Sequence, residues 1–271
     1  FPTRRSSDLN DTTDFSDLAR GVVVDLDLDD VDGNGAAGTA TSDGKIDTLI
    51  AIENVIGTTS NDTITGDNNN NTIIGNDGDD TFKGLGGVDY FSGGVGTDTI
   101  DFSDATSAGI KVNLTTVQTV GDSLTYRVQN DGYNNTEYLI GVENIIGTNQ
   151  VDTVIGDDLA NSLVGGASDD TLWGGANNDS LIGGDDNDTL SGDLGDDYID
   201  GGNGTHDTVD FKRSATAVTV NLSSTAIIAL GNETNVTFQT QKATGEGTDT
   251  LLNIEDAIGS NFADTIKHCV K

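Results

Sequence analysis

A period of nine residues constrains this chain more than any other feature of its sequence. From Gly57 onward, each unit opens with Gly, carries Asp or Asn at its sixth position and an apolar residue at its eighth. One array covers residues 57–101, a second covers 147–210, and a third begins at Gly259. One such unit is a weak signal, but twelve in phase over two arrays indicate a repeat architecture.

The spacing predicts the fold. Gly, Asn and Asp over six residues favour a turn, and three residues around an apolar centre favour a very short strand. Two units close one coil, so residues 18 apart should stack about 4.8 Å from each other. The expected apolar ladders are Ile64, Phe82 and Ile100 facing Ile73 and Phe91, and Val154, Leu172 and Leu190 facing Leu163, Leu181 and Ile199. We therefore predict an all-β chain that forms a parallel β-roll, or β-solenoid, with a core only two side chains wide.

Composition indicates that something besides apolar burial stabilises this fold. The 271 residues include 46 acids and 12 bases, a net charge of −34, and only 34% of them are hydrophobic. Low hydrophobicity with high net charge is typical of disorder, because such a chain buries too little apolar area. The sequence favours Asp over Glu and is rich in Gly, and position-six Asp residues should stack coil upon coil. Such columns of like charge predict bound multivalent cations.

Charge and motifs also exclude several functions. A strongly acidic surface repels nucleic acids and anionic membranes. No apolar run of 18 residues exists, so no membrane span is predicted, and the lone Cys269 cannot form an internal disulfide. No G-x-S-x-G or H-E-x-x-H motif occurs, and His206, which stands at position six of its unit, is interpreted as marking the end of an array. We therefore predict no catalytic residues and no enzyme activity for this chain.

The units follow a known consensus. Residues 93–101 (GGVGTDTID) fit G-G-x-G-x-D-x-U-x at every position. Elsewhere Asn177 and Asp186 replace the Gly at position four, and both residue types tolerate the left-handed conformation of a tight turn. Ser168 at position four and Leu85 at position two fit less well. On these repeats the sequence resembles the RTX, or haemolysin-type calcium-binding, family.

The resemblance implies several Ca²⁺ ions, each held between turns of successive coils by a position-six Asp and turn carbonyls. The carboxylates assigned in this way are Asp62, Asp80, Asp89, Asp98, Asp152, Asp170, Asp179, Asp188 and Asp197. The glycines assigned with them are Gly75, Gly84, Gly93, Gly165, Gly174, Gly183 and Gly192. The competing interpretation is that these Asp residues only stabilise turns. The resemblance further implies a secreted, extracellular protein exported by a type I system, whose repeats fold on binding Ca²⁺ outside the cell.

A longer repeat encloses the arrays. Alternating strands are expected around Val24, Val112 and Val220, and each stretch closes with a similar segment that contains Glu53, Glu143 or Glu255. Either these Glu residues accept backbone N–H bonds, which we favour, or they are additional Ca²⁺ ligands. The predicted segments are 10–56, 57–101 (array 1), 102–146, 147–210 (array 2), 211–258 and 259–271 (a truncated array 3), with the inter-array segments extending or flanking the solenoid. Residues 1–9 look like non-native, adapter-derived sequence.

Two smaller features stay open. Residues 30–35 (DVDGNG) match the first half of an EF-hand loop but lack its Glu at position 12, so an acidic loop is favoured over an isolated Ca²⁺ site. Position nine points outward and is apolar at Ile155 and Trp173 on one side of the coil and at Val164 and Ile182 on the other. Either the strands at 110–114 or 218–222 cover these residues, or a neighbouring module or protein partner does, at the Ile155/Trp173 face. The chain would then be a calcium-binding module, with an adhesin, a surface spacer or the non-catalytic C-terminal part of a secreted hydrolase or toxin as alternatives.

Overall fold

The computed structural model describes residues 11–26, 38–120, 123–222, 241–244 and 247–267. Every regular element in this part of the chain is a β-strand, and the chain divides into two compact units, residues 1–149 and 150–271. The predicted all-β parallel roll is therefore confirmed. The described residues contain no helix long and apolar enough to cross a bilayer. The EF-hand-like loop, residues 1–9 and Cys269 lie outside the described residues.

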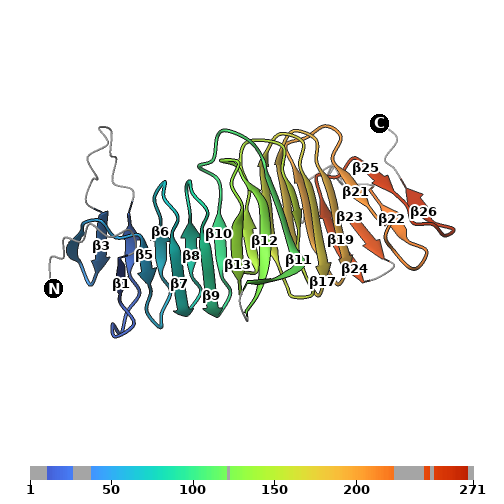
Figure 1. Ribbon diagram of the computed structural model, residues 1–271. Coiled ribbons are helices and arrows are strands. Elements are labelled where there is room, and N and C mark those ends of the chain that lie inside the picture. Colours follow the sequence, from blue (N-terminus) through green and yellow to red (C-terminus); the bar gives the residue numbers. More distant parts are fainter. Residues whose placement is uncertain (1–10, 27–37, 121–122, 223–240, 245–246, 268–271) are drawn as a thin grey trace, which may run out of the picture. The chain divides into compact units, whose positions relative to one another are not determined.

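Unit 1 contains two faces of stacked strands (Figure 1). The strands of the first face, in spatial order, are β1 (Thr12–Asp14), β5 (Asn54–Ile56), β7 (Thr72–Asp77), β9 (Tyr90–Val95), β13 (Glu137–Ile140), β12 (Ser123–Asp131) and β11 (Ile110–Val120). Those of the second are β14 (Asn144–Ile146), β10 (Thr99–Asp101), β8 (Thr81–Lys83), β6 (Thr63–Thr65), β2 (Val23–Asp25), β3 (Gly38–Ser42) and β4 (Lys45–Leu49).

Unit 2 repeats this arrangement. One face contains β15 (Thr153–Ile155), β17 (Thr171–Ala176), β19 (Thr189–Leu194), β21 (Thr208–Asp210) and β25 (Asp256–Ile258). The other contains β16 (Ser162–Ala167), β18 (Ser180–Asp185), β20 (Tyr198–Gly202), β24 (Thr248–Leu252), β23 (Gln241–Thr244), β22 (Thr219–Asn221) and β26 (Thr265–Lys267). Neighbouring array strands pair in parallel with a shift of 18 residues.

The position-eight side chains form the predicted ladders. Ile64 pairs with Phe82 and Phe82 with Ile100 on one face of unit 1, while Ile73 pairs with Phe91 on the other. The rings of Phe82 and Phe91 approach to 6.0 Å between centroids, so the two faces meet in the interior. In unit 2 the same register joins Val154 to Leu172 and Leu190, and Leu163 to Leu181 and Ile199. All of these side chains are fully buried.

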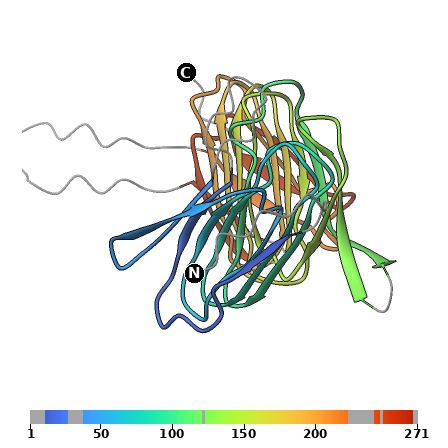
Figure 2. The same cartoon turned by 60° about the vertical axis from the view of Figure 1, so that its left-hand side comes forward.

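Two features differ in detail from the expected three-residue strands. Several array strands have six residues, because the parallel ladder continues into the Gly pair of the next unit, as where Gly166 pairs with Gly184. The inter-array segments are themselves coils of the roll: β2 lies parallel to β6, β13 to β9 and β24 to β20. Antiparallel hairpins such as β3–β4 leave this stack (Figure 2). In this structure the inter-array segments thus place strands β2, β13 and β24 in the parallel stack.

Candidate metal sites in the turns

The position-six aspartates are buried and joined from coil to coil. The N–H of Asp62 donates to Asp80 Oδ1 at 2.7 Å, and the N–H of Asp80 donates to Asp98 Oδ1 at 2.9 Å. In unit 2 the N–H of Asp170 donates to Asp188 Oδ1 at 2.8 Å, and the same pattern links Asp179 to Asp197. The predicted stacking is therefore present, and each aspartate has its Oδ1 fixed by the preceding coil.

The second carboxylate oxygen of most of these residues has no partner. Among the described residues, the buried Oδ2 atoms without a hydrogen bond in the turns belong to Asp80, Asp89, Asp98, Asp170, Asp179, Asp188, Asp197 and Asp207. A buried polar atom without a partner is costly, and native proteins rarely leave one. A row of such atoms at equivalent positions therefore indicates that these oxygens are ligand donors.

At Asp170 and Asp188 this oxygen lies close to a main-chain carbonyl of the next coil. A Cβ atom built on Gly165 would overlap Asp170 Oδ2 and lie 2.6 Å from the carbonyl oxygen of Gly183. A Cβ atom on Gly183 would likewise overlap Asp188 Oδ2 and lie 2.6 Å from the carbonyl oxygen of Gly201. A carboxylate oxygen and a carbonyl oxygen thus converge on the space that a glycine leaves open. Neither atom is a donor, so a cation satisfies both.

The backbone conformation at position two separates two kinds of turn. In what we call closed turns, the position-two N–H donates to the position-six side chain: Thr58 to Asp62 Oδ2 at 2.6 Å, Asp67 to Asn71 Oδ1 at 2.9 Å, and Asp157 to Asn161 Oδ1 at 2.9 Å. In open turns position two has a positive φ, and the position-six Oδ2 has no donor. The open-turn residues at position two are Asn76, Leu85, Gly94, Gly166, Gly175, Gly184, Asp193 and Gly202.

The two observations coincide without exception: the eight unpartnered Oδ2 atoms lie in the eight open turns. The predicted left-handed conformation at position four also occurs, with φ of 67° at Asn177 and 76° at Asp186. Even Ser168, a poorer fit, adopts it with φ of 77°. In an open turn, the left-handed residue at position two does not donate its backbone N–H to the position-six Oδ2, and this oxygen is left without a hydrogen bond.

Electrostatics supports a bound cation. Burial raises the pKa of Asp170 to about 8, against the hydrogen bond from the Asp152 N–H, and the Asp152 and Asp188 carboxylates raise it further. Burial likewise raises the pKa of Asp98 and Asp188 to about 7. Without a counter-ion, the folded chain would therefore have to protonate several of these carboxylates near neutral pH.

The donor set fits Ca²⁺. Calcium takes six to eight oxygen ligands and accepts carboxylates together with backbone carbonyls. Within the described ranges, no group of three or more His, Cys, Asp and Glu side chains is placed to hold a metal. Each turn contributes one carboxylate, so main-chain carbonyls must supply much of the coordination. Bound there, Ca²⁺ would neutralise the stacked carboxylates and join successive coils.

Of the predicted site residues, only the aspartates divide along the same line, because the closed-turn glycines Gly57, Gly66 and Gly156 have the same contact as the assigned glycines. The assigned glycines whose ideal Cβ would contact the position-six side chain of their own unit are Gly75, Gly84, Gly93, Gly165, Gly174, Gly183 and Gly192. Asp62 differs from the other assigned aspartates, because Thr58 and Val22 already donate to its two oxygens. Asp152 is also absent from the set with an unpartnered oxygen. The open turns are thus the better candidates.

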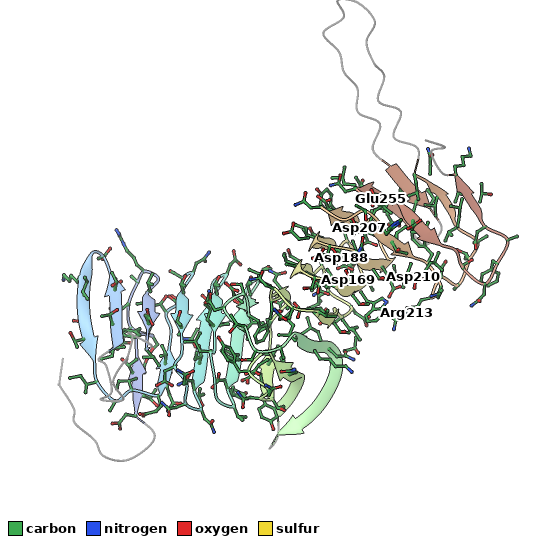
Figure 3. All side chains as sticks on the ribbon, turned by 90° about the horizontal axis from the view of Figure 1, so that it is seen from above. Asp169, Asp188, Asp207, Asp210, Arg213 and Glu255 are labelled. Atoms are coloured by element: carbon green, nitrogen blue, oxygen red, sulfur yellow. The ribbon has the colours of Figure 1, made fainter. Side chains whose placement is uncertain are left out.

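One functional residue was missed at position six. His206 was placed there, but its side chain is 75% exposed and lies 3.2 Å from Asp256. Asp207 joins the ladder instead: it is fully buried and accepts the N–H of Asp188 at 2.9 Å. The signal was present in the sequence, because this unit has one extra residue and Asp207-Thr208-Val209 restores the pattern. Figure 3 shows Asp188 and Asp207 in unit 2.

The three register-matched glutamates accept backbone N–H bonds, as favoured. Glu53 accepts from Asp11 at 2.8 Å, Glu143 from Asp98 at 2.9 Å and Glu255 from Asp207 at 3.1 Å. They therefore continue the ladder onto the next coil. Figure 3 labels the last of these pairs.

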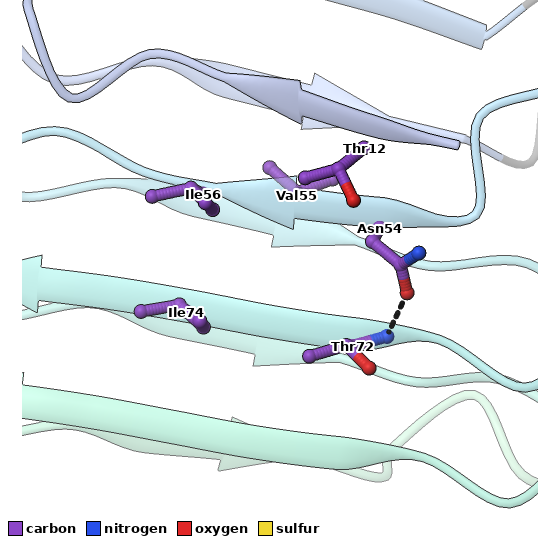
Figure 4. A pocket seen from close by; sticks show the side chains of 6 residues that line it. All are labelled: Thr12, Asn54, Val55, Ile56, Thr72 and Ile74. Carbon is purple, nitrogen blue, oxygen red and sulfur yellow. Dashed lines mark hydrogen bonds between the residues drawn. The ribbon is translucent and has the colours of Figure 1, made fainter. Parts of the chain in front are cut away.

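Two surface features lie outside the ladder. A shallow pocket in unit 1 is lined by Thr12, Asn54, Val55, Ile56, Thr72 and Ile74, and its hydrogen bond from the Thr72 N–H to Asn54 Oδ1 is 2.9 Å long (Figure 4). No acid lines it.

On the outer face of unit 2, the Arg213 guanidinium lies 5.4 Å from the Trp173 ring centre and is held by Asp193 at 3.1 Å. An intramolecular contact thus covers part of that face, from a residue that the sequence analysis did not consider.

Of the comparisons with known proteins, the one with protein families matches the repeats of both arrays. The family model for the RTX calcium-binding nonapeptide repeat (4 copies) matches residues 50–76, 65–100, 146–181, 155–190 and 173–205. No curated protein matches the chain. Among solved structures, the extracellular lipase LipA from Serratia marcescens is similar at 18% identity, with a TM-score of 0.24. That match covers 74% of this chain and 37% of the lipase.

Proposed function

We propose that this chain, whose two arrays are RTX calcium-binding nonapeptide repeats, is the calcium-dependent folding module of a secreted protein. The repeats bind several Ca²⁺ ions. We assign these ions to the open turns, each with its position-six carboxylate and the carbonyls of the next coil. The observation that carries this assignment is the coincidence of unpartnered buried carboxylate oxygens with left-handed residues at position two.

Calcium is proposed to control folding because the metal-free roll has two weaknesses. Its core is only two side chains wide, and its buried carboxylates lack counter-charges. A chain of net charge −34 with so thin a core should be largely disordered without the ion. Extracellular calcium modules bind with dissociation constants of roughly 10⁻⁴–10⁻³ M, too weak for a resting cytosol. The chain would thus stay unfolded during export and fold outside the cell.

The module itself is proposed to be non-catalytic. RTX repeats are typically non-catalytic, and in the described residues the open-turn aspartates each use one carboxylate oxygen to accept a backbone N–H of the ladder. The parent protein's activity would then reside in other segments. An adhesin or surface spacer remains the second candidate, supported by the exposed apolar side chains of Leu159 and Leu194 on unit 2.

A calcium titration tests the proposal. The full chain, first stripped with a chelator, should gain β-sheet circular dichroism cooperatively as Ca²⁺ rises through about 0.1–1 mM. Mg²⁺ at the same concentration should have little effect, because it demands a smaller, near-octahedral site. An unchanged β spectrum in excess chelator would contradict calcium-coupled folding.

A further inference from the structure

On the face of unit 1 that contains β9, the ladder of position-six side chains ends on Glu137, an acid that belongs to no repeat. β13 lies on β9, with Tyr138 paired to Tyr90, and this register places Glu137 where the next position-six aspartate would stand. The N–H of Asp89 donates to Glu137 Oε2 at 2.5 Å, just as the N–H of Asn71 donates to Asp89 Oδ1 at 2.8 Å. Glu137 therefore takes the structural place of a repeat aspartate from a strand 48 residues further along the chain.

Both acids at this junction keep one oxygen without a partner. Asp89 Oδ2 and Glu137 Oε1 are buried and unbonded, and each residue is only 1% exposed. Other acids that end a ladder do not share this property. Among the described residues, neither Glu143, Asp249 nor Glu255 has a buried oxygen without a partner, although each accepts the N–H of a position-six residue. A role limited to ending the ladder therefore does not explain why the second oxygen of Glu137 is buried without a hydrogen-bond partner.

The surroundings of these two oxygens are acidic. The Asp131 carboxylate also lies against Glu137. Its Oδ1 accepts the N–H groups of Tyr133 and Asn135, both at 2.8 Å, and its Oδ2 accepts the Asn135 side-chain amide at 3.3 Å. No described basic side chain forms an ion pair with Asp89, Asp131 or Glu137. Burial raises the pKa of Glu137 to about 9, and the Asp89 carboxylate raises it further. Burial also raises the pKa of Asp89 to about 8, with Asp131 and Asp67 adding to the effect.

We propose that Asp89 and Glu137 together bind one Ca²⁺ ion at the junction between array 1 and the following segment. Two anionic oxygens, unpartnered and shielded from solvent, are hard donors of the kind calcium prefers. Main-chain carbonyls and water complete such a set, while Asp131 positions the 131–137 turn and adds negative charge. The inference rests on the same donor chemistry as the proposed function. It identifies Glu137, which lies beyond residue 100, where the repeat match of unit 1 ends, as a second acid for the ion assigned to the Asp89 turn.

The site would hold the β11–β12 hairpin segment to the array. Segment 102–146 returns to the roll through β13, and Glu137 is the first residue of that strand. An ion shared between Asp89 and Glu137 would fasten this return to the last open turn of the same face. The segment would then fold with the array on binding Ca²⁺.

Counting bound ions tests the site. The full chain carrying Glu137→Gln is compared with wild type by equilibrium dialysis against about 1 mM Ca²⁺, with β-sheet content followed by circular dichroism. Glutamine still accepts the Asp89 N–H but removes the charge. We expect one ion fewer per chain than in wild type. The matched control is Glu143→Gln, which follows the same array and accepts the Asp98 N–H, and which should retain the full number of ions.

The outcomes separate this inference from the proposed function. A wild-type chain that binds no Ca²⁺ refutes the proposed function. A wild-type chain that binds several ions, with Glu137→Gln binding as many and as tightly, overturns only the junction site. Equal losses in both glutamine variants also overturn it. If Glu137→Gln does not fold in Ca²⁺, then Asp89→Asn replaces it, since Asn71 and Asn161 already occupy position six. If Asp89→Asn binds as many ions as the wild type, the junction site is likewise refuted.

Discussion

At position six, an aspartate uses its two carboxylate oxygens differently. In Asp179 one oxygen accepts the N–H of Asn161, its counterpart in the preceding coil, at 2.8 Å, and this bond sets the orientation of the side chain. The other oxygen is unpartnered and points into the turn. Asparagine can perform the first task but cannot supply a negative charge. The sequence places asparagine at position six only in Asn71 and Asn161, and both lie in closed turns.

The first prediction follows from this division. Asp179→Asn should keep the ladder bond but lose the anionic ligand, so the chain should bind about one ion fewer at ~1 mM Ca²⁺ and fold at a higher Ca²⁺ concentration. Equilibrium dialysis and a circular dichroism titration measure the two effects. The matched control is Asp158→Asn in the same array, because the Asp158 side chain is exposed and only its carbonyl is bonded, to Asn177. Equal effects in the two variants would mean that loss of charge alone weakens binding.

At the level of the turn, backbone conformation decides whether a unit can hold an ion. Closed turns satisfy their position-six side chain internally, and open turns do not. Left-handed conformations at Asn76, Leu85 and Asp193 show that glycine is not required to open a turn. Glycine at position one has another purpose: its missing side chain leaves room for the converging oxygens.

The second prediction uses that room. Gly183→Ala would place a methyl group against Asp188 Oδ2 and 2.6 Å from the Gly201 carbonyl oxygen, and so block the site without removing an acid. We expect the variant to bind about one ion fewer and to need more Ca²⁺ to fold, as measured by the same dialysis and titration. Gly86→Ala is the control, since the nearest atom to its Cβ is the Asn68 side-chain oxygen at 3.0 Å, which can move. Normal binding by Gly183→Ala would refute the proposed position of the ion.

For the whole molecule, the ladder couples folding to protons as well as to calcium. The folded pKa is raised above 3.8 for the open-turn carboxylates, to about 6 for Asp80, about 7 for Asp179 and about 8 for Asp170, with burial as the first cause in each. The metal-free folded chain therefore holds more protons than the unfolded chain between about pH 4 and pH 8. The contribution of these carboxylates to stability is therefore greatest below about pH 4 and is lost as the pH rises through their folded pKa values of about 6 to 8.

The third prediction is that acid partly replaces calcium. In excess chelator, the chain should show more β-sheet circular dichroism at pH 5 than at pH 7.5, because protonation removes the repulsion between buried carboxylates. With Ca²⁺ present, the midpoint of the titration should instead shift to higher concentration at pH 5, since protons compete with the ion. A metal-free spectrum that gains no β signal on acidification would contradict this coupling.

Much of this protein could be predicted from the order of its residues. The nine-residue period alone predicts the 18-residue coil, the ladders through Phe82 and Leu172, and the stacked aspartates, because each depends on local turn and strand preferences repeated in phase. The stacked aspartates and the excess of acids predicted multivalent cations, and the resemblance to the RTX repeat implied that these are Ca²⁺. A strictly local sequence pattern can predict the fold in this case, because each coil contacts only the coils next to it.

The tertiary structure decided what depends on distant contacts or on backbone conformation. Asp62 and Asp80 look alike in sequence, yet only Asp80 keeps an oxygen without a hydrogen bond. The N–H of the residue four positions before Asp62 donates to it, whereas the residue four positions before Asp80 is left-handed and does not donate. Asp207 enters the ladder only because the turn absorbs an inserted residue. Glu137 joins Asp89 because β13 returns to the array across 48 residues, and no nine-residue pattern specifies which later strand will stack on an open coil.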